Sequence, residues 1–385
     1  MAALKTVYAQ VSLFDRFKIY SLIFVMPVVV VWNLFLYSTL RRHIVKSKKW
    51  SRIIVEIRWR FTTSFLSVNQ IQYMMGTSVQ TYKDWAHAHG LPVTIEEIST
   101  GSNSSSKKAR LFWIGPKKLD RVILYLHGGA FLVPLQHVSI SFWRCIQLSL
   151  QEKSEMDSGV CILDYSLYPG SPFPTQLLQA KAALKYLIDS GVEPCNIQLA
   201  GDDSGAYIIL KLLGELTRPN SSIRLAQPLG SVYLMSPWVP FNHDGDKSGS
   251  FCENDHMDVI TSQTLEKWSQ YTSRDFPKPP SPAQAVVNSV KKGRKRDSVP
   301  SHGYLGISAA VQRMLITVGK HECLRDDVVR VVDQLRKHHP LVRFILQGDG
   351  VHNDPYLDLL AGEREAKLMV VIMDWFAEVF RNEVV

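Results

Sequence analysis

Cysteine is scarce in this chain, and its spacing excludes the common cysteine-based sites. The 385 residues include five cysteines, an odd number, and no two of them form a Cys-x-x-Cys pair. Zinc sites and disulfide frameworks usually show paired, regularly spaced cysteines. We therefore expect free and mostly buried thiols, and the sequence implies no metal and no organic cofactor. The cysteines are Cys145, Cys161, Cys195, Cys252 and Cys323.

Acidic residues are outnumbered by basic ones, which gives a formal net charge of +9. Much of the excess lies in two runs, residues 41–52 and 291–296. Neither run belongs to a recognisable nucleic-acid-binding module, so we expect no nucleic-acid partner. Both runs are typical of solvated loops or of a patch beside a membrane. The proline-rich segment 276–300 is expected to be an exposed insertion.

Charge is missing altogether from residues 19–40, a run long enough to cross a bilayer once. The basic residues that follow do not fit a signal-peptide cleavage site. We therefore expect a single-pass anchor, with a buried core helix as the alternative, in a membrane of the endoplasmic reticulum. More basic residues follow the run than precede it, which favours a cytosolic catalytic domain. Glycosylation triplets at Asn103 and Asn220 favour the lumen, so the orientation stays open.

From residue 110 onward, short apolar runs alternate with helical stretches, which predicts an α/β fold with a mostly parallel sheet covered by helices on both faces. We expect a membrane anchor and basic flank at 1–50, a helical lid and linker at 51–106, and the sheet domain at 107–385. One or two helices are expected over 50–88. The expected strands are 111–114, 122–126, 160–163, 197–200, 230–234, 314–318 and 342–346, and the main helices are 142–150, 176–188, 326–338 and 363–380.

A sharp strand-to-helix turn is predicted at Leu-Ala-Gly-Asp-Asp-Ser-Gly-Ala, residues 199–206. Such a turn lifts a nucleophile above a sheet, and small residues are needed two positions before and after it. Centring the turn on Asp203 places glycines at both positions, whereas centring it on Ser204 places Asp202 at one of them. The spacing therefore favours Asp203. Acyl-transfer chemistry favours Ser204, because carboxylate attack on an ester carbonyl gives a reactive anhydride.

Glycines also follow the expected strand 122–126, in His-Gly-Gly-Ala, residues 127–130. Backbone N–H groups in such a turn can hold an oxygen that becomes negative during acyl transfer. We expect the N–H groups of Gly128, Gly129 and Gly205 to form this oxyanion hole.

Several motifs occur in order: His-Gly-Gly-Ala, then Asp-Tyr-Ser-Leu-Tyr-Pro at 164–169, Gly-Asp-Asp-Ser-Gly-Ala, and Ser-Pro-Trp at 236–238. Together they resemble the hormone-sensitive-lipase-like α/β hydrolases, and among them the membrane-anchored steryl acetyl hydrolases of fungi. The resemblance implies an α/β-hydrolase fold and a triad in the order Ser, acid, His. It implies Glu322, in Gly-Lys-His-Glu-Cys-Leu-Arg-Asp, as the acid and His352 as the general base.

Three readings of the site follow. In the first, which the resemblance favours, the turn shifts by one residue and Ser204 attacks an ester, such as the acetyl ester of an apolar sterol-like alcohol or secondary metabolite. In the second, Asp203 is a nucleophile or base for other chemistry, such as opening an epoxide or displacing a halide at an alkyl carbon. In the third, hydrolysis is lost and the fold binds, isomerises or cyclises a ligand. The expected partners are a small apolar substrate and a membrane.

Overall fold

The computed structural model describes residues 8–40, 48–100, 108–154, 157–239, 249–272 and 304–381. Its centre is an eight-stranded sheet with the order β1-β2-β4-β3-β5-β6-β7-β8. The pairs β1–β2 and β2–β4 are antiparallel, and all other neighbours are parallel. The predicted mostly parallel sheet of an α/β hydrolase is confirmed. The strands are β1 (Thr94–Ile98), β2 (Ala109–Trp113), β3 (Val122–Leu126), β4 (Gly159–Asp164), β5 (Ile197–Asp202), β6 (Ser231–Met235), β7 (Met314–Gly319) and β8 (Val342–Gln347).

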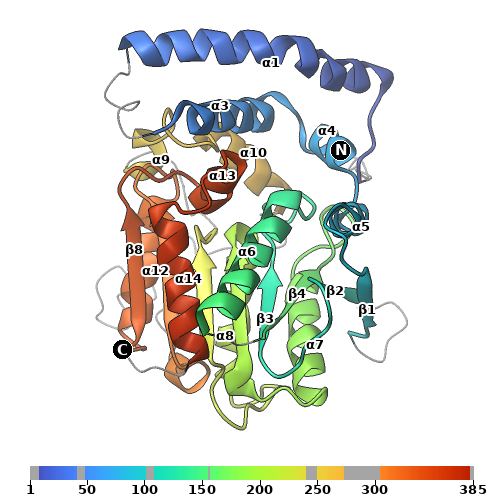
Figure 1. Ribbon diagram of the computed structural model, residues 1–385, viewed down its shortest axis with the longest axis vertical. Coiled ribbons are helices and arrows are strands. Elements are labelled where there is room, and N and C mark those ends of the chain that lie inside the picture. The colour runs from blue at the N-terminus through green and yellow to red at the C-terminus, as the bar shows by residue number, and fades with distance from the viewer. Residues whose placement is uncertain are drawn as a thin grey trace, which may run out of the picture.

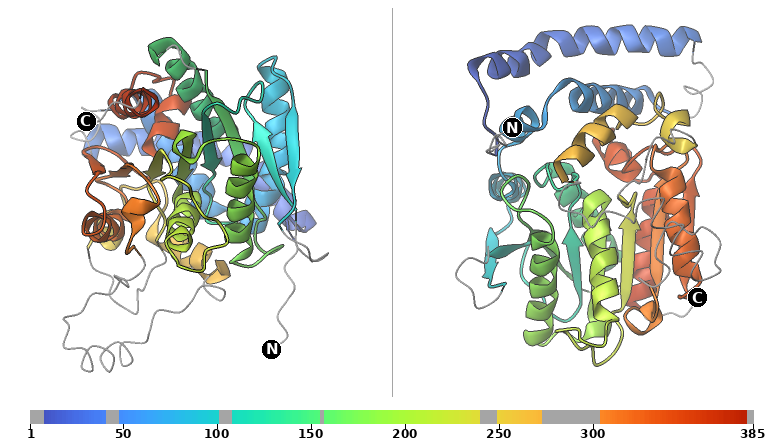
Figure 2. Two further views of the ribbon diagram at one scale, coloured as in Figure 1. Left: turned by 90° about the horizontal axis from the view of Figure 1, so that it is seen from below. Right: turned by 180° about the vertical axis from the view of Figure 1, so that it is seen from behind.

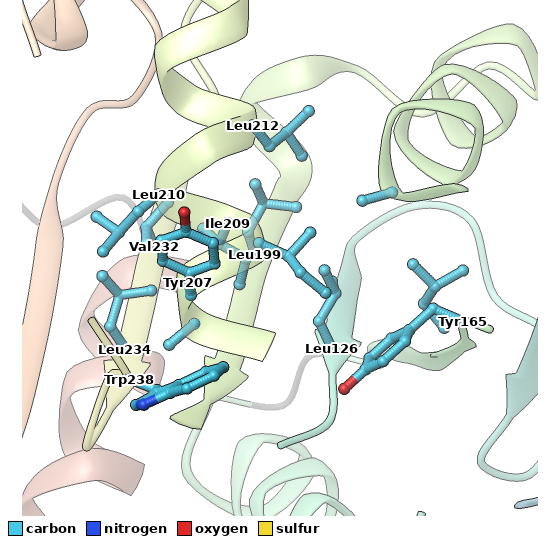
Figure 3. Close-up of a cluster of buried hydrophobic side chains, with 14 of the residues drawn as sticks. Leu126, Tyr165, Leu199, Tyr207, Ile209, Leu210, Leu212, Val232, Leu234 and Trp238 are labelled. Atoms are coloured by element: carbon cyan, nitrogen blue, oxygen red, sulfur yellow. The ribbon is translucent and has the colours of Figure 1, made fainter. Parts of the chain in front are cut away.

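Helices cover both faces of this sheet (Figures 1 and 2). One face carries α6 (His137–Ser154) and α14 (Lys367–Phe380), and the other carries α7 (Thr175–Asp189), α8 (Asp203–Leu216) and α12 (Arg325–Arg336). Strands β3 to β7 are buried along their whole length, which explains why they read as continuous apolar runs. Figure 3 shows part of this core, with Leu199 and Val232 of the strands beside Ile209 of α8.

The segment expected as lid and linker holds three helices rather than one or two: α3 (Trp50–Phe65), α4 (Val68–Met75) and α5 (Ser78–Ala88). Strand β1 follows these helices and pairs with β2. The predicted domain boundary at residue 106 therefore falls inside the sheet, between two paired strands. The sequence signal for β1 was weak, because an edge strand with Glu96 and Glu97 has no continuous apolar run.

Helix α1 (Leu13–Leu40) lies across α3 at one end of the molecule (Figure 1). Lys18 Nζ donates to Phe65 O at 2.6 Å, and Gln70 Nε2 of α4 donates to Asp15 Oδ1 at 2.7 Å. Residues 13–36 contain an 18-residue window with a mean hydropathy of 2.3 and are long and apolar enough to cross a membrane. Only 6% of this window is buried, which excludes the buried core helix. Its exposed large apolar side chains include Phe14, Phe17, Phe24, Val28 and Trp32.

The remaining helices lie around the carboxyl ends of the strands: α9 (Ser250–Glu253), α10 (Ser262–Thr272) and α13 (Asp354–Leu360). Two short 3-10 turns, Pro194–Asn196 and Ile307–Ala309, precede β5 and β7. The expected insertion 276–300, the basic run 291–296 and Asn103 lie outside the described residues. Asn220 lies on an exposed turn after α8.

Arg52, part of the first basic run, is not in a solvated loop or membrane patch but is buried in α3. Its Nε donates to Glu56 Oε1 at 3.0 Å, and its guanidinium also binds the carboxylates of Asp354 and Asp358 in α13. Asp354 in turn accepts from the N–H of Val351. A single guanidinium thus joins α3 to α13 and, through Asp354, to the loop that precedes α13.

Replacing Arg52 by alanine is expected to lower the free energy of unfolding by about 3–5 kcal/mol, because three carboxylates lose their buried cation. Chemical denaturation of the full chain in detergent measures this change. Lys185→Ala is the matched control, since Lys185 and Asp189 form an exposed pair within one helix. We expect that control to cost about 0.5 kcal/mol or less. Equal losses in the two variants would contradict a structural role for the buried network.

Candidate active site

The turn between β5 and α8 has Asp203 at its apex. Asp203 has φ +46°, in the left-handed region that non-glycine residues rarely adopt. A Cβ at Gly201 would lie 2.8 Å from the carbonyl carbon of Gly205, and a Cβ at Gly205 would lie 2.0 Å from Leu126 O. Strand and helix therefore cross so closely that both positions require glycine. The turn is therefore centred on Asp203, with a glycine two positions before it and another two positions after it.

The carboxylate of Asp203 has two oxygens in different surroundings. Its Oδ2 accepts hydrogen bonds from the N–H groups of Gly129 at 2.8 Å and Ala130 at 2.7 Å. Its Oδ1 lies 4.0 Å from Nε2 of His352. Gly129 and Ala130 both have positive φ, which turns their N–H groups towards one point. A carboxylate oxygen of the chain itself thus occupies the pair of donors that would otherwise hold a substrate oxygen.

Of the N–H groups predicted to form an oxyanion hole, that of Gly129 meets the Asp203 carboxylate together with that of Ala130, whereas that of Gly128 does not. The N–H of Gly128 donates to Asp202 Oδ1 at 3.1 Å, and Ala130 is the second donor beside Gly129. The reason is the buried carboxylate of Asp202, which also accepts from the hydroxyls of Tyr125 and Tyr356 and draws the N–H of Gly128 away. Gly205, expected as a third donor, lies where α8 approaches β3 so closely that only glycine fits.

Ser204, predicted as the attacking residue, is fully buried in the first turn of α8. Its Oγ accepts from the N–H of Phe131 at 3.2 Å and lies 3.5 Å from the hydroxyl of Tyr165. The shift of the turn by one residue that would present Ser204 is not seen, because the left-handed apex residue is Asp203. The side chain beside His352 is therefore a carboxylate.

His352 and Glu322 come together as the sequence predicted. Glu322 follows β7, His352 follows β8, and Oε2 of Glu322 lies 3.2 Å from Nδ1 of His352. The other oxygen of Glu322 accepts from Ser236 Oγ at 2.7 Å and from the N–H of Gly319 at 2.5 Å. These bonds fix the carboxylate so that it orients the imidazole, with Nε2 towards Asp203.

Two further residues, Asp258 and Ser236, connect the acid loop to the histidine loop. Asp258 is buried, and its carboxylate accepts from the N–H of His352 at 3.0 Å and from the N–H of Cys323 at 2.8 Å. Ser236 Oγ donates to Glu322 and accepts from the N–H of Asn353. Sequence reasoning missed Asp258, which carries no motif. Ser236 could have been found from sequence, because it begins the Ser-Pro-Trp motif.

Charge interactions keep His352 protonated at neutral pH. Burial alone would lower the pKa of His352, but the hydrogen bond to Glu322 and the carboxylates of Glu322, Asp203 and Asp258 raise it to about 9. Burial raises the pKa of Asp202 to about 6, with Asp203 adding to the shift. Burial lowers the pKa of His127 to about 4, so this imidazole is neutral. The resting site thus holds an imidazolium beside the Asp203 carboxylate.

A cavity of about 380 Å³ lies over these groups. Among the described residues its walls include Asp203 and His352, and they do not include Ser204. His127 Nε2 and Asn353 Oδ1 have no hydrogen-bond partner among the described residues, and both residues line the cavity. Most of the wall is apolar and comes from α3, α4, the turn after β3, the loop before α10, α10 and α13. It includes Val55, Trp59, Ile71, Met75, Val133, Ile260, Trp268 and Leu357.

Comparisons with known proteins agree with this architecture. A family model described as steryl acetyl hydrolase matches residues 17–365. The protein mug81 of Schizosaccharomyces pombe, named for steryl acetyl hydrolase activity, is 25% identical over 254 residues, or 63% of this chain and 62% of that protein. An acetyl-hydrolase of Streptomyces hygroscopicus is 27% identical over 227 residues, or 58% of this chain and 64% of that protein. The chain thus spans slightly under two thirds of the length of these two relatives.

Among solved structures, an esterase of the bacterial hormone-sensitive lipase family superposes with a TM-score of 0.60. The match covers 86% of this chain and 98% of that esterase at 18% identity, which shows a common α/β-hydrolase fold. Because the family model matches nearly the whole described chain, the protein belongs to the steryl acetyl hydrolase family.

Proposed function

We propose that this protein is a carboxylic ester hydrolase that removes acetyl or similarly short acyl groups from apolar alcohols. Membership of the steryl acetyl hydrolase family supports the reaction class. The observation that carries the proposal is the carboxylate of Asp203, held between two N–H donors and the His352–Glu322 pair, at the wall of an apolar cavity. The intact acid and histidine argue against a fold that only binds or rearranges a ligand.

In the proposed first step, Oδ1 of Asp203 attacks the acyl carbon and the alcohol leaves. His352, whose pKa is about 9, is protonated at neutral pH and gives its proton to the departing alkoxide. The protonated His352 is therefore ready to act as the acid that this step needs. A serine nucleophile would need the same histidine to be neutral. The products are the free alcohol and an acyl anhydride on Asp203.

In the proposed second step, water hydrolyses the anhydride. His352, now neutral, takes a proton from the water as its oxygen adds to Cγ of Asp203. The oxyanion that forms is Oδ2, which already accepts from the N–H groups of Gly129 and Ala130. When the acyl carboxylate leaves, Asp203 returns to its ionised form and one proton passes to solvent. The oxyanion hole of this protein is thus placed for the second step.

We propose that α1 holds the enzyme at a membrane, where apolar esters dissolve. Helix α3 lies between α1 and the cavity that it lines, so the anchor and the substrate site share one wall (Figure 1). Lys48 and Arg52, counted among the basic residues that favour a cytosolic domain, are engaged with Glu56 and α13 instead. With these two residues removed from the count, the excess of basic residues after the apolar run is smaller, and the argument for a cytosolic domain is weaker. The exposed Asn220 suits the lumen of the endoplasmic reticulum, which we propose as the location.

The test is acetate release from the acetyl ester of an apolar alcohol in detergent micelles, followed as kcat/KM against pH. Because the active form has His352 protonated, kcat/KM is expected to fall as pH rises through about 9. Asp258→Asn removes one negative charge beside His352, which lowers its pKa and moves this fall to lower pH by about one unit or less. Asp255→Asn, in the same loop, is the control and leaves the profile in place.

Two results would contradict this proposal. If kcat/KM rises through the pKa of His352, the nucleophile needs a neutral histidine and is not a carboxylate. If a folded wild-type protein releases no acetate from any short acyl ester, the ester hydrolase function itself is wrong.

A further inference from the structure

We propose that the protein also opens epoxides of apolar molecules to diols, through attack of Asp203 at a saturated carbon. This activity uses the same carboxylate and the same His352 as the ester reaction. It does not require Asp203 to attack a carbonyl group, so it stands or falls separately from the proposed ester hydrolysis.

The first argument is that the oxyanion hole is already filled. When a nucleophile attacks an ester carbonyl, negative charge develops on the substrate oxygen, and free donors beside that oxygen accelerate the step. Here the N–H groups of Gly129 and Ala130 are bonded to Oδ2 of Asp203 itself. Attack at a saturated carbon creates no oxyanion on that carbon and needs no such hole. The two N–H groups instead hold the carboxylate while Oδ1 faces His352 and the cavity.

The second argument concerns the leaving group. His352 Nε2, which lies 4.0 Å from Oδ1 of Asp203, is positioned to protonate an oxygen displaced by Asp203. A strained ring oxygen needs such a proton, because it leaves as an alkoxide that stays attached to the substrate. A halide leaves without one. The imidazolium beside the nucleophile therefore favours an epoxide over an alkyl halide, and the apolar wall of the cavity favours an epoxide on a hydrocarbon framework.

The reaction balances with water as the only co-reactant. Oδ1 of Asp203 forms a bond to one ring carbon, the bond from that carbon to oxygen breaks, and the oxygen takes the proton of His352. Water then loses a proton to neutral His352 and adds to Cγ of the resulting ester, with Oδ2 held by Gly129 and Ala130. The diol leaves as its alkoxide takes a proton from His352. Transfer of the proton of Asp203 to His352 restores the starting state.

The experiment is a single turnover in water labelled with oxygen-18, with the folded full-length protein in excess over 1,2-epoxydecane. We expect the first diol to carry unlabelled oxygen from Asp203, and the peptide that contains Asp203 to gain the label. Under multiple turnovers the diol becomes labelled. Asp203→Ala is expected to lower diol formation by about 10⁴-fold, and Ser204→Ala to leave it within a few-fold of wild type.

Each other outcome overturns the inference in a distinct way. Absence of diol, while acetate is still released from an ester, refutes epoxide opening and leaves the ester function standing. Diol that is labelled in the first turnover, with no label in the Asp203 peptide, means that water adds directly and that Asp203 is not the nucleophile. Absence of both products from folded protein refutes the epoxide reaction and the proposed ester function together.

Discussion

Replacing Asp203 by alanine is expected to reduce kcat for ester hydrolysis by about 10⁴-fold or more, the effect of removing the nucleophile from a triad. Ser204→Ala is expected to change kcat by no more than a few-fold. The reason is position: Asp203 Oδ1 faces His352, whereas Ser204 Oγ accepts from the N–H of Phe131 inside the protein. Steady-state hydrolysis of one acetyl ester by both variants, at equal folded fraction, measures the difference.

The pair of variants also controls for disturbance of the turn. Ser204→Ala removes a buried hydrogen bond next to the apex and leaves the apex residue unchanged. If Ser204→Ala were the inactive variant and Asp203→Ala retained activity, the carboxylate mechanism would be refuted. Asp203→Ser is informative in the same assay, since it places a hydroxyl at the apex and frees the N–H groups of Gly129 and Ala130.

Glu322→Gln is expected to lower kcat by about 10⁴-fold, as amide substitution of a triad acid does when it selects the wrong histidine tautomer. The glutamine oxygen can keep the bonds from Ser236 Oγ and the N–H of Gly319, so the loop stays in place. Its amide then presents a donor to Nδ1 of His352. The loss of the negative charge also lowers the pKa of His352, so that the imidazolium acid of the first step is missing at neutral pH.

Nuclear magnetic resonance of the His352 ring, or the pH dependence of residual activity, separates this effect from unfolding. A variant that unfolds loses activity at every pH and also loses its cooperative thermal transition. A folded Glu322→Gln protein with near wild-type turnover would contradict the assigned role of Glu322.

The parts of the site that depend on chain order could be predicted from sequence. Strands β3, β5, β7 and β8 are apolar runs that end at the same edge of a parallel sheet, so the residues that follow them must meet there. The glycine-rich turn could be placed in this way, whereas Glu322 and His352 were implied by the resemblance to the hydrolase family, and the sheet edge brings them together. Steric crowding of the backbone determines that Asp203, and not Ser204, lies at the apex of the turn. The spacing of Gly201 and Gly205 in the sequence already indicates this.

Other parts depend on contacts that leave no local pattern. The N–H of Ala130, rather than that of Gly128, meets Asp203 because Gly128 donates to Asp202. The orientation of Asp202 is in turn set by the hydroxyls of Tyr125 and Tyr356, which lie far away in sequence. Asp258 lies in a loop without regular structure, and only the folded chain brings it to His352. Sequence alone places Arg52 in a run of cations expected at the surface, because its carboxylate partners in α13 lie far away in sequence.

The carboxylate at the apex of the elbow also determines which reagents can detect this protein. Phosphonates and sulfonyl fluorides report a hydrolase by forming a stable bond with an activated hydroxyl. The oxygen that Asp203 offers gives only a labile mixed anhydride with such reagents, and Ser204 is out of their reach. We therefore expect hydroxyl-directed reagents to leave this protein unlabelled, and carbodiimides or strained-ring electrophiles are the reagents suited to its chemistry.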